Sequence, residues 1–176
     1  MSVNPIARYD GYADWYDKWV ADPALDFVAQ SLLQLIGRPT GERILDMGCG
    51  QGRIARELAD AANAVVGVDL SRELLSIAHA ERTDSIEYIH GDVCTTAWWD
   101  GVPFDGAISS MALMDIDDLH GALATAAATV RQAGWFAWSI IHPAFAGTGD
   151  IRASWPTRGS YFDEGWWNTG GDGVRG

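Results

Sequence analysis

Short apolar runs alternate with longer segments of helical periodicity through the middle of the chain, and this alternation limits the fold more than any other feature of the sequence. Each apolar run stops at or near a glycine or an aspartate. The pattern is typical of parallel strands joined by crossover helices, so we predict an α/β fold. The expected strands are residues 43–46, 64–69, 86–90, 104–109 and 135–141. The expected helices between them are residues 52–60, 71–82 and 119–132.

The first forty residues are expected to form two amphipathic helices. Between residues 9 and 19, tyrosine and tryptophan alternate with aspartate at helical spacing, which gives an aromatic stripe beside an acidic one. A second helical pattern follows Pro23 and stops at Gly37. Three tyrosines of the first helix can either cover a bound ligand or pack the helix against the sheet: Tyr9, Tyr12 and Tyr16.

The length and the apolar content suit one structural domain. The chain has 176 residues, 48% of them apolar, which is enough for one well-buried core but leaves little room for two full domains. Within this domain we expect a helical cap at residues 1–40, an α/β core at 41–146 and a C-terminal segment at 147–176. The C-terminal segment is rich in glycine and tryptophan and predicts neither a strand nor a helix.

Charge and cysteine content exclude several classes of function. The net charge of -12 would repel a phosphate backbone, and the 12 Lys and Arg residues are scattered, so we expect no nucleic-acid partner. Cys49 and Cys94 form neither a CxxC motif nor a cluster with histidine, so we expect no disulfide framework and no metal site. Because the chain shows no signal-peptide pattern and no apolar run of about 20 residues, we expect a cytoplasmic protein without membrane contact.

The strongest local signal is residues 44–53, which read ILDMGCGQGR and predict a strand, a glycine-rich turn and the start of a helix. Glycines let the backbone approach a ligand closely, because they lack a Cβ atom and tolerate positive φ. The loop therefore predicts a bound nucleoside or nucleotide, with an ordinary strand-to-helix turn as the alternative. A dinucleotide fingerprint needs glycine where Arg53 stands, and a P-loop needs Gly-Lys-Ser/Thr, so NAD, FAD and nucleoside triphosphates are disfavoured.

Two aspartates follow the next two predicted strands. Asp69 ends the second strand about 20 residues after the glycine loop, where a carboxylate can accept hydrogen bonds from ribose hydroxyls, and Asp92 closes the third strand. Either residue alone can serve as a helix cap or a turn residue. Because ligands of open α/β sheets collect at the carboxyl ends of the strands, the two together favour a shared ligand site. Three further aspartates, Asp115, Asp117 and Asp118, are expected to form a solvated turn and a helix cap.

Residues 43–145 resemble the class I S-adenosylmethionine-dependent methyltransferases, particularly the branch that acts on small molecules. The segments that match successive family motifs, in order, are residues 45–52, 67–71, 91–93, 104–110 and 131–136. The resemblance implies a Rossmann-like, open, mostly parallel sheet with helices on both faces. It also implies S-adenosyl-L-methionine as the cofactor and S-adenosyl-L-homocysteine as the product.

The resemblance also implies roles for individual residues. Asp46 and the loop glycines would line the methionine part of the cofactor, Asp69 would hold the ribose, and Asp92 would lie beside the adenine amino group. Tyr12 and Met111 would face the methyl acceptor. The full set of expected cofactor-binding residues is Tyr16, Asp46, Gly48, Cys49, Gly50, Asp69, Leu70, Asp92, Val93, Ser109 and Ser110.

A sulfonium cofactor already carries an activated methyl group, so the protein has mainly to align an acceptor behind that methyl and to exclude water. His142, just past the fifth predicted strand, is the candidate catalytic base, although a His-Pro pair can also simply shape a turn. A tyrosine face such as that of Tyr16 favours the sulfonium through a cation–π contact. Trp166 and Trp167 can line the site of a planar acceptor or pack the C-terminal segment.

The chain departs from the family after the fifth strand, where family members usually carry two more strands in an antiparallel hairpin. Without them, the fifth strand would leave a row of unpaired backbone groups at the edge of the sheet. Three explanations stay open: a missing segment, which we prefer, a natural truncation, or an edge completed by another copy of the chain in a homodimer.

The leading hypothesis is an enzyme that transfers a methyl group to O, N or C of a small organic metabolite by in-line displacement. A non-catalytic S-adenosylmethionine-binding subunit that requires a partner is the alternative from another class. A nicotinamide-dependent oxidoreductase is disfavoured by Arg53 in the glycine loop.

Overall fold

A computed structural model describes residues 7–21, 26–61 and 63–141 of the chain. The chain divides into two compact units, Met1–Ser139 and Ile140–Gly176. Of the second unit, only Ile140 and Ile141 lie among the described residues. The helices and strands of the described residues all belong to the first unit.

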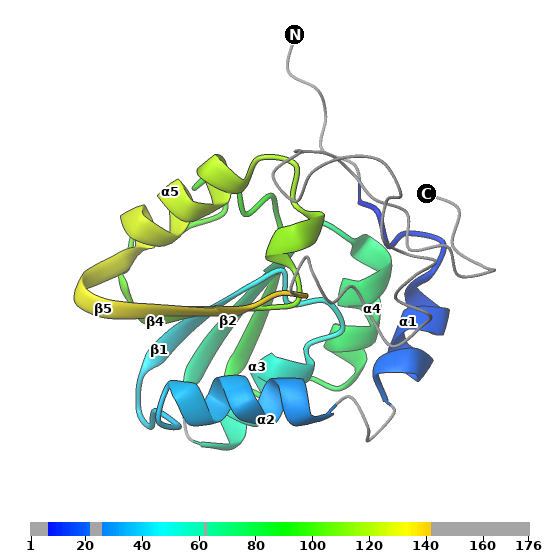
Figure 1. Cartoon of the computed structure of the whole chain (residues 1–176), viewed down its shortest axis with the longest axis horizontal. Helices are drawn as coiled ribbons and strands as arrows, with labels where there is room; N and C mark the ends of the chain where they lie inside the picture. Colours follow the sequence, from blue (N-terminus) through cyan, green and yellow to red (C-terminus); the bar gives the residue numbers. More distant parts are fainter. Residues whose placement is uncertain (1–6, 22–25, 62, 142–176) are drawn as a thin grey trace, which may run out of the picture. The chain divides into compact units, whose positions relative to one another are not determined.

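The first unit is built on a five-stranded sheet in the order β3-β2-β1-β4-β5 (Figure 1). Every pair of neighbouring strands is parallel, which confirms the Rossmann-like sheet expected from the sequence. The chain places β2 and β3 on one side of β1, and β4 and β5 on the other, so the strand order reverses at β1. The strands are β1 (Arg43–Met47), β2 (Ala64–Asp69), β3 (Ile86–His90), β4 (Phe104–Ser110) and β5 (Val130–Ser139).

Helices cover both faces of the sheet, as predicted. One apolar core joins residues of α2, α3 and α4 to one face of the strands, including Ile44 and Val65. A second core joins α5 and the segment after β3 to the opposite face, including Leu45 and Val66. Figure 1 shows α2 and α5 on opposite sides of the sheet. The helices are α1 (Ala13–Val20), α2 (Asp26–Leu35), α3 (Arg53–Asp60), α4 (Arg72–Ala80) and α5 (Leu119–Thr129), with a short 3₁₀ helix η2 (Leu113–Asp115).

The junction between α5 and β5 differs from the prediction of a helix to residue 132 and a strand from residue 135. β5 begins at Val130, directly after α5. Val130 pairs with Phe104 of β4, and the register then shifts before it resumes at Trp135. Within this shift Ala133 has a φ of 63°, in the left-handed region. Sequence periodicity misses the early start of the strand, because the pairing partner of Val130 lies on β4 rather than nearby in the chain.

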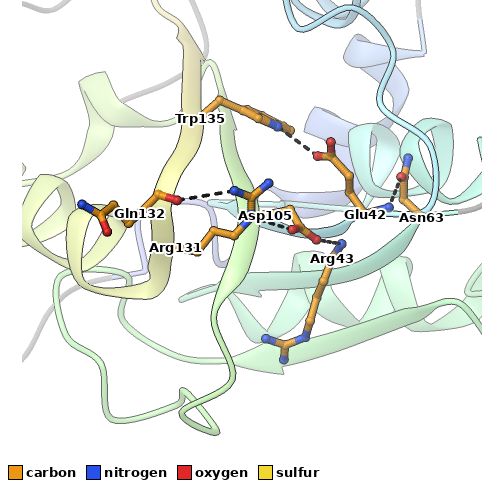
Figure 2. A network of polar contacts seen from close by, with 7 residues as sticks. All are labelled: Glu42, Arg43, Asn63, Asp105, Arg131, Gln132 and Trp135. Carbon is orange, nitrogen blue, oxygen red and sulfur yellow. Dashed lines mark hydrogen bonds and ion pairs between the residues drawn. The ribbon is translucent and has the colours of Figure 1, made fainter.

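A polar network joins the first residues of β1, β4 and β5 at the amino end of the sheet (Figure 2). Asp105 accepts hydrogen bonds from the Arg43 backbone N–H and from Arg131 Nε, both at 2.8 Å. These two donors, the Arg43 N–H first, lower the pKa of Asp105. The Trp135 indole N–H donates to a Glu42 carboxylate oxygen at 2.9 Å. This end of the sheet is therefore occupied by contacts between strands.

Asn63 completes the network and offers a test of the fold. Its amide, 1% exposed, accepts from the Glu42 N–H at 3.0 Å and donates to the backbone oxygens of Pro39 and Leu58 at 2.8 and 2.9 Å. We predict that Asn63→Ala lowers the free energy of unfolding by about 3 kcal/mol in urea denaturation, because buried groups lose their partners. Asn63→Asp should be at least as harmful, since a carboxylate oxygen would face two carbonyl oxygens. A loss below about 1 kcal/mol for the alanine variant would contradict this.

Candidate functional site

The glycine loop between β1 and α3 is shaped by close contacts that only glycine permits. Gly48, with a φ of 73°, donates its backbone N–H to the Val68 carbonyl of β2 at 2.8 Å. A Cβ atom at Gly48 would lie 2.5 Å from the Ala112 Cβ atom, and one at Gly52, whose φ is 82°, would collide with the Tyr88 hydroxyl. The loop is therefore packed between the residues that follow β4 on one side and the side chain of a β3 residue on the other.

Asp69 lies beside the loop, at the end of β2, as the sequence predicts. One carboxylate oxygen accepts the Gly50 N–H and the other accepts the Ser71 N–H, both at 2.8 Å. Burial raises the pKa of Asp69, and the backbone N–H groups of Ser71, Gly50 and Leu70 lower it in part. One carboxylate thus ties together the end of β2, the glycine loop and the start of α4.

Asp46, at the end of β1, is the most unusual group of the site. It is 1% exposed, and neither carboxylate oxygen has a hydrogen-bond partner in the part of the chain that the structure describes. Burial, followed by the nearby charge of Asp69, raises the pKa of Asp46 to about 7. The Ala55 backbone N–H lowers this pKa by a smaller amount, but its geometry is too poor for a hydrogen bond. Burial together with both aspartates also raises the pKa of the neighbouring Cys49 thiol.

Asp92, after β3, forms a turn of its own. Its carboxylate accepts the Cys94 N–H at 2.9 Å, and its backbone oxygen accepts the Trp98 indole N–H at 3.1 Å. A Cβ atom at Gly91 would lie 3.0 Å from the Trp98 ring, so this glycine makes room for the indole. The predicted neighbour Val93 is buried. Sequence reasoning missed Trp98, since its role shows only in this contact with the turn.

Leu70 and the serines of β4 occupy different surroundings. His90 Nε2 lies 3.0 Å from the Leu70 carbonyl oxygen. Ser109 is fully buried and donates its hydroxyl to the Met47 carbonyl oxygen at 2.8 Å, so this side chain joins β4 to β1. Ser110 Oγ lies 3.3 Å from the Ser139 hydroxyl of β5. Met111 adopts a φ of 57° and donates its backbone N–H to the Ser139 carbonyl oxygen.

Residues 8–11, here called the N-terminal strap, bind to residues that follow β2 and β4, the two strands that flank β1. On the β2 side, Asp10 accepts the Ser71 hydroxyl and the Gly11 N–H donates to Glu73, both at 2.6 Å. On the β4 side, the Tyr9 hydroxyl donates to Asp115 at 2.8 Å. Arg8 forms an ion pair with Asp117 at 2.5 Å on the same side, next to Asp115 in the chain. The strap therefore spans the position of β1 from one neighbouring strand to the other.

Two tyrosines of the N-terminal region lie together near two carboxylates. The rings of Tyr9 and Tyr16 meet edge to face, with centroids 4.9 Å apart. Burial raises the pKa of Tyr16, and the charges of Asp115 and Asp69 raise it further. Tyr12 is more exposed, at 37%. Tyr16 therefore packs against Tyr9, the residue that binds Asp115.

The expectation that Asp115 belongs to a solvated turn is wrong. Its side chain is half-buried and bonded to Tyr9, from which it is separated by 106 residues in sequence. The helix-cap part of that prediction is confirmed, because Asp118 accepts the Gly121 N–H at the start of α5. Apolar residues on both sides of Asp115, namely Met114 and Ile116, were the only sequence signal of its burial.

Several predicted acceptor-side residues lie outside the described residues: His142, Trp166 and Trp167. Among residues 7–21, 26–61 and 63–141, no three His, Cys, Asp or Glu side chains gather as ligands for a metal ion. No helix in that same part of the chain is both long and apolar enough to cross a membrane.

The buried carboxylate of Asp46 should make the free energy of unfolding depend on pH. Its folded pKa of about 7 exceeds the ordinary value of 3.8, so ionisation opposes folding, and the wild type loses stability as pH rises through this window. We predict that Asp46→Asn raises the free energy of unfolding by an amount that grows between pH 4 and pH 7 and then stays level at about 2–4 kcal/mol. Denaturation at several pH values measures this, and a difference independent of pH would contradict it.

Comparison with known proteins agrees with this geometry. A family profile described as a methyltransferase domain matches residues 45–138, more than half of the chain. The ubiquinone biosynthesis O-methyltransferase of Alkalilimnicola ehrlichii is 31% identical over 149 residues, which are 78% of this chain and 59% of that protein. The demethylmenaquinone methyltransferase of Bacillus licheniformis is 30% identical over 138 residues, which are 75% of this chain and 53% of that protein.

A solved methyltransferase structure is also similar to this chain. The S-adenosylmethionine-dependent methyltransferase from Mesorhizobium loti matches with a TM-score of 0.60 and 29% identity, over 77% of this chain and 56% of that one. The chain spans about half the length of the curated relatives it matches. The strand order, the glycine loop and the matched profile agree, and the chain belongs to the class I S-adenosylmethionine-dependent methyltransferases.

Proposed function

We propose that this chain catalyses transfer of a methyl group from S-adenosylmethionine to O, N or C of a small organic molecule. The observation that carries the proposal is the Asp46 carboxylate, buried beside the glycine loop without a hydrogen-bond partner among the described residues. Such a group costs free energy unless a ligand supplies donors. The α-ammonium group in the methionine part of the cofactor is cationic and supplies them.

The neighbouring residues fit the rest of the cofactor. Each Asp69 oxygen accepts one backbone N–H and keeps a second lone pair that can accept a ribose hydroxyl. Asp92 and Val93 would hold the adenine, because they follow the strand next to β2. The charge of Asp69 contributes to the raised pKa of Tyr16, and the ring of Tyr16 would offer an aromatic face to the sulfonium, a contact worth about 0.5–2 kcal/mol.

The cofactor supplies an activated methyl group on a sulfonium when it is bound. The residues of the chain have to bind, orient and enclose the reactants. In our proposal Asp46 holds the methionine end of the cofactor and Asp69 its ribose, and the glycine loop lets the backbone approach it. The N-terminal strap binds to residues that follow β2 and β4, the two neighbours of β1, and would keep water from the reacting atoms.

Small organic molecules are the proposed acceptors. The relatives named above carry names that refer to ubiquinone biosynthesis and to demethylmenaquinone. Another relative, 34% identical over 97 residues, is named as an N,N-dimethyltransferase of a dTDP-linked amino sugar. The net charge of -12 also argues against a nucleic-acid acceptor.

Calorimetry tests the cofactor part of the proposal. We predict that S-adenosylmethionine and S-adenosylhomocysteine each bind one to one, whereas NAD does not bind. Asp69→Asn should weaken both adenosyl ligands by about 10–100-fold, the effect of losing one charge-assisted hydrogen bond. Asp60→Asn, at the exposed end of α3, is the control with the same charge change and should bind like the wild type.

A labelled-methyl assay with hydroxyl, amine and carbon-acid acceptors tests turnover. Binding without transfer to any acceptor is the result expected of a non-catalytic subunit that requires a partner. Failure of the wild type to bind either adenosyl ligand would overturn the proposed function itself.

A further inference from the structure

Asp115 occupies a position that the cofactor assignment leaves unused. It lies in η2, immediately after β4, and one carboxylate oxygen accepts the Tyr9 hydroxyl at 2.8 Å. Its side chain makes no other hydrogen bond to the residues that the structure describes. The half-buried carboxylate is therefore held by a single donor and keeps its second oxygen, Oδ1, available.

Asp69 and Asp115 lie on opposite sides of β1 in the sheet, which divides the site into two halves. Asp115 accepts the hydroxyl of Tyr9, whose ring contacts Tyr16. Asp69 accepts the N–H of Ser71, whose hydroxyl binds Asp10, the residue after Tyr9. Asp69 ends β2, whereas Asp115 follows β4, and these strands flank β1 on opposite sides. Since the β2 side is assigned to the nucleoside, Asp115 lies on the side that remains for the methyl acceptor.

The groups around Asp115 tune its basicity. Burial raises the pKa of Asp115, and the Tyr9 hydrogen bond and then the charge of Arg8 lower it. Arg8 itself pairs with the more exposed Asp117. Burial and the nearby Asp115 raise the pKa of Tyr9, which keeps its phenol protonated as the donor. The result is a carboxylate more basic than an exposed aspartate, with a fixed orientation.

We propose that Asp115 is the general base for a phenolic hydroxyl acceptor and that Tyr9 is the residue that positions it, an inference that rests on the proposed function. The acceptor oxygen forms a bond to the methyl carbon, and the carbon–sulfur bond breaks with its electron pair left on sulfur. The hydroxyl proton passes to Asp115 Oδ1 and from there to solvent. One ether, one neutral thioether and one proton are the products.

The chemistry of Asp115 selects this acceptor class. A neutral amine has a free lone pair and needs no base before it attacks, whereas a hydroxyl has to lose its proton as it is methylated. A phenol becomes more acidic as its oxygen bonds to carbon, so a carboxylate of raised basicity can take its proton in the transition state. The edge-to-face pair of Tyr9 and Tyr16 beside Asp115 also offers aromatic surface to a planar ring.

Two variants, Asp115→Asn and Tyr9→Phe, distinguish a role of Asp115 in proton transfer from a role in anchoring the strap. Asp115→Asn keeps an oxygen for the Tyr9 hydrogen bond but cannot accept a proton. With catechol as the probe, we predict that kcat falls by about 10²–10⁴-fold, while S-adenosylmethionine affinity changes by less than about threefold. Asp60→Asn, at the exposed end of α3 and away from the strap, is the control with the same charge change and should keep kcat within about twofold of the wild type.

Tyr9→Phe tests the positioning role through the pH profile. Since the Tyr9 hydrogen bond lowers the pKa of Asp115, its removal should shift the acidic limb of the kcat profile to higher pH, with a loss of about 3–10-fold in kcat. This variant decides the matter by itself if a thermal melt shows that Asp115→Asn is unfolded. An unchanged acidic limb would overturn the proposal.

Other results would also overturn the proposal and leave the proposed function standing. One is wild-type kcat on catechol in folded Asp115→Asn. Another is that Asp115→Asn and Tyr9→Phe weaken S-adenosylmethionine binding equally and leave kcat unchanged, which would make Asp115 only an anchor of the strap. A third is transfer by the wild type to aniline but not to phenol or catechol. The proposed function fails differently, because the wild type would then bind no S-adenosylmethionine.

Discussion

The carboxylate of Asp69 is the interaction on which the site depends. It binds the backbone of Gly50 with one oxygen and that of Ser71 with the other, so the glycine loop and the start of α4 are fixed by the same anion. Such charge-assisted hydrogen bonds are stronger than neutral ones. The same residue ends β2, and the loop it holds begins where β1 ends. The geometry of the site therefore follows from the pairing of two adjacent parallel strands.

Burial of acidic groups gives this site its chemical character. Asp46 is enclosed without donors among the described residues, and Asp115 has one donor. The nearby cation Arg8 is already paired with another carboxylate. A folded chain that keeps such groups out of water gives up part of its own stability, as functional sites commonly do. A cationic or donor-rich ligand recovers that free energy on binding, which fits the class of ligand that we propose.

Much of the fold, but less of the site, could be predicted from the sequence. β2 and β3 have the predicted bounds, because the apolar run of β2 and the alternation of apolar and polar residues in β3 are local signals. The early start of β5 was missed, since it depends on pairing with β4. Asp46 and Asp69 could be found because they sit at fixed distances from the glycine loop. The pair of Tyr9 and Asp115 could not, because a contact between such distant positions leaves no trace in periodicity.

The attachment of the strap on both sides of β1 affects how a ligand reaches the end of the sheet. Residues 8–11 hold to the start of α4 through Asp10 and Gly11, and to η2 and its flank through Tyr9 and Arg8. In the proposed site, a ligand that binds at the carboxyl end of β1 would lie next to this strap, and one set of these bonds would have to open to admit it. Ligand binding would then include the opening of the strap as a step within the protein. The rate constant observed for binding would level off at high ligand concentration, because this step does not depend on the ligand.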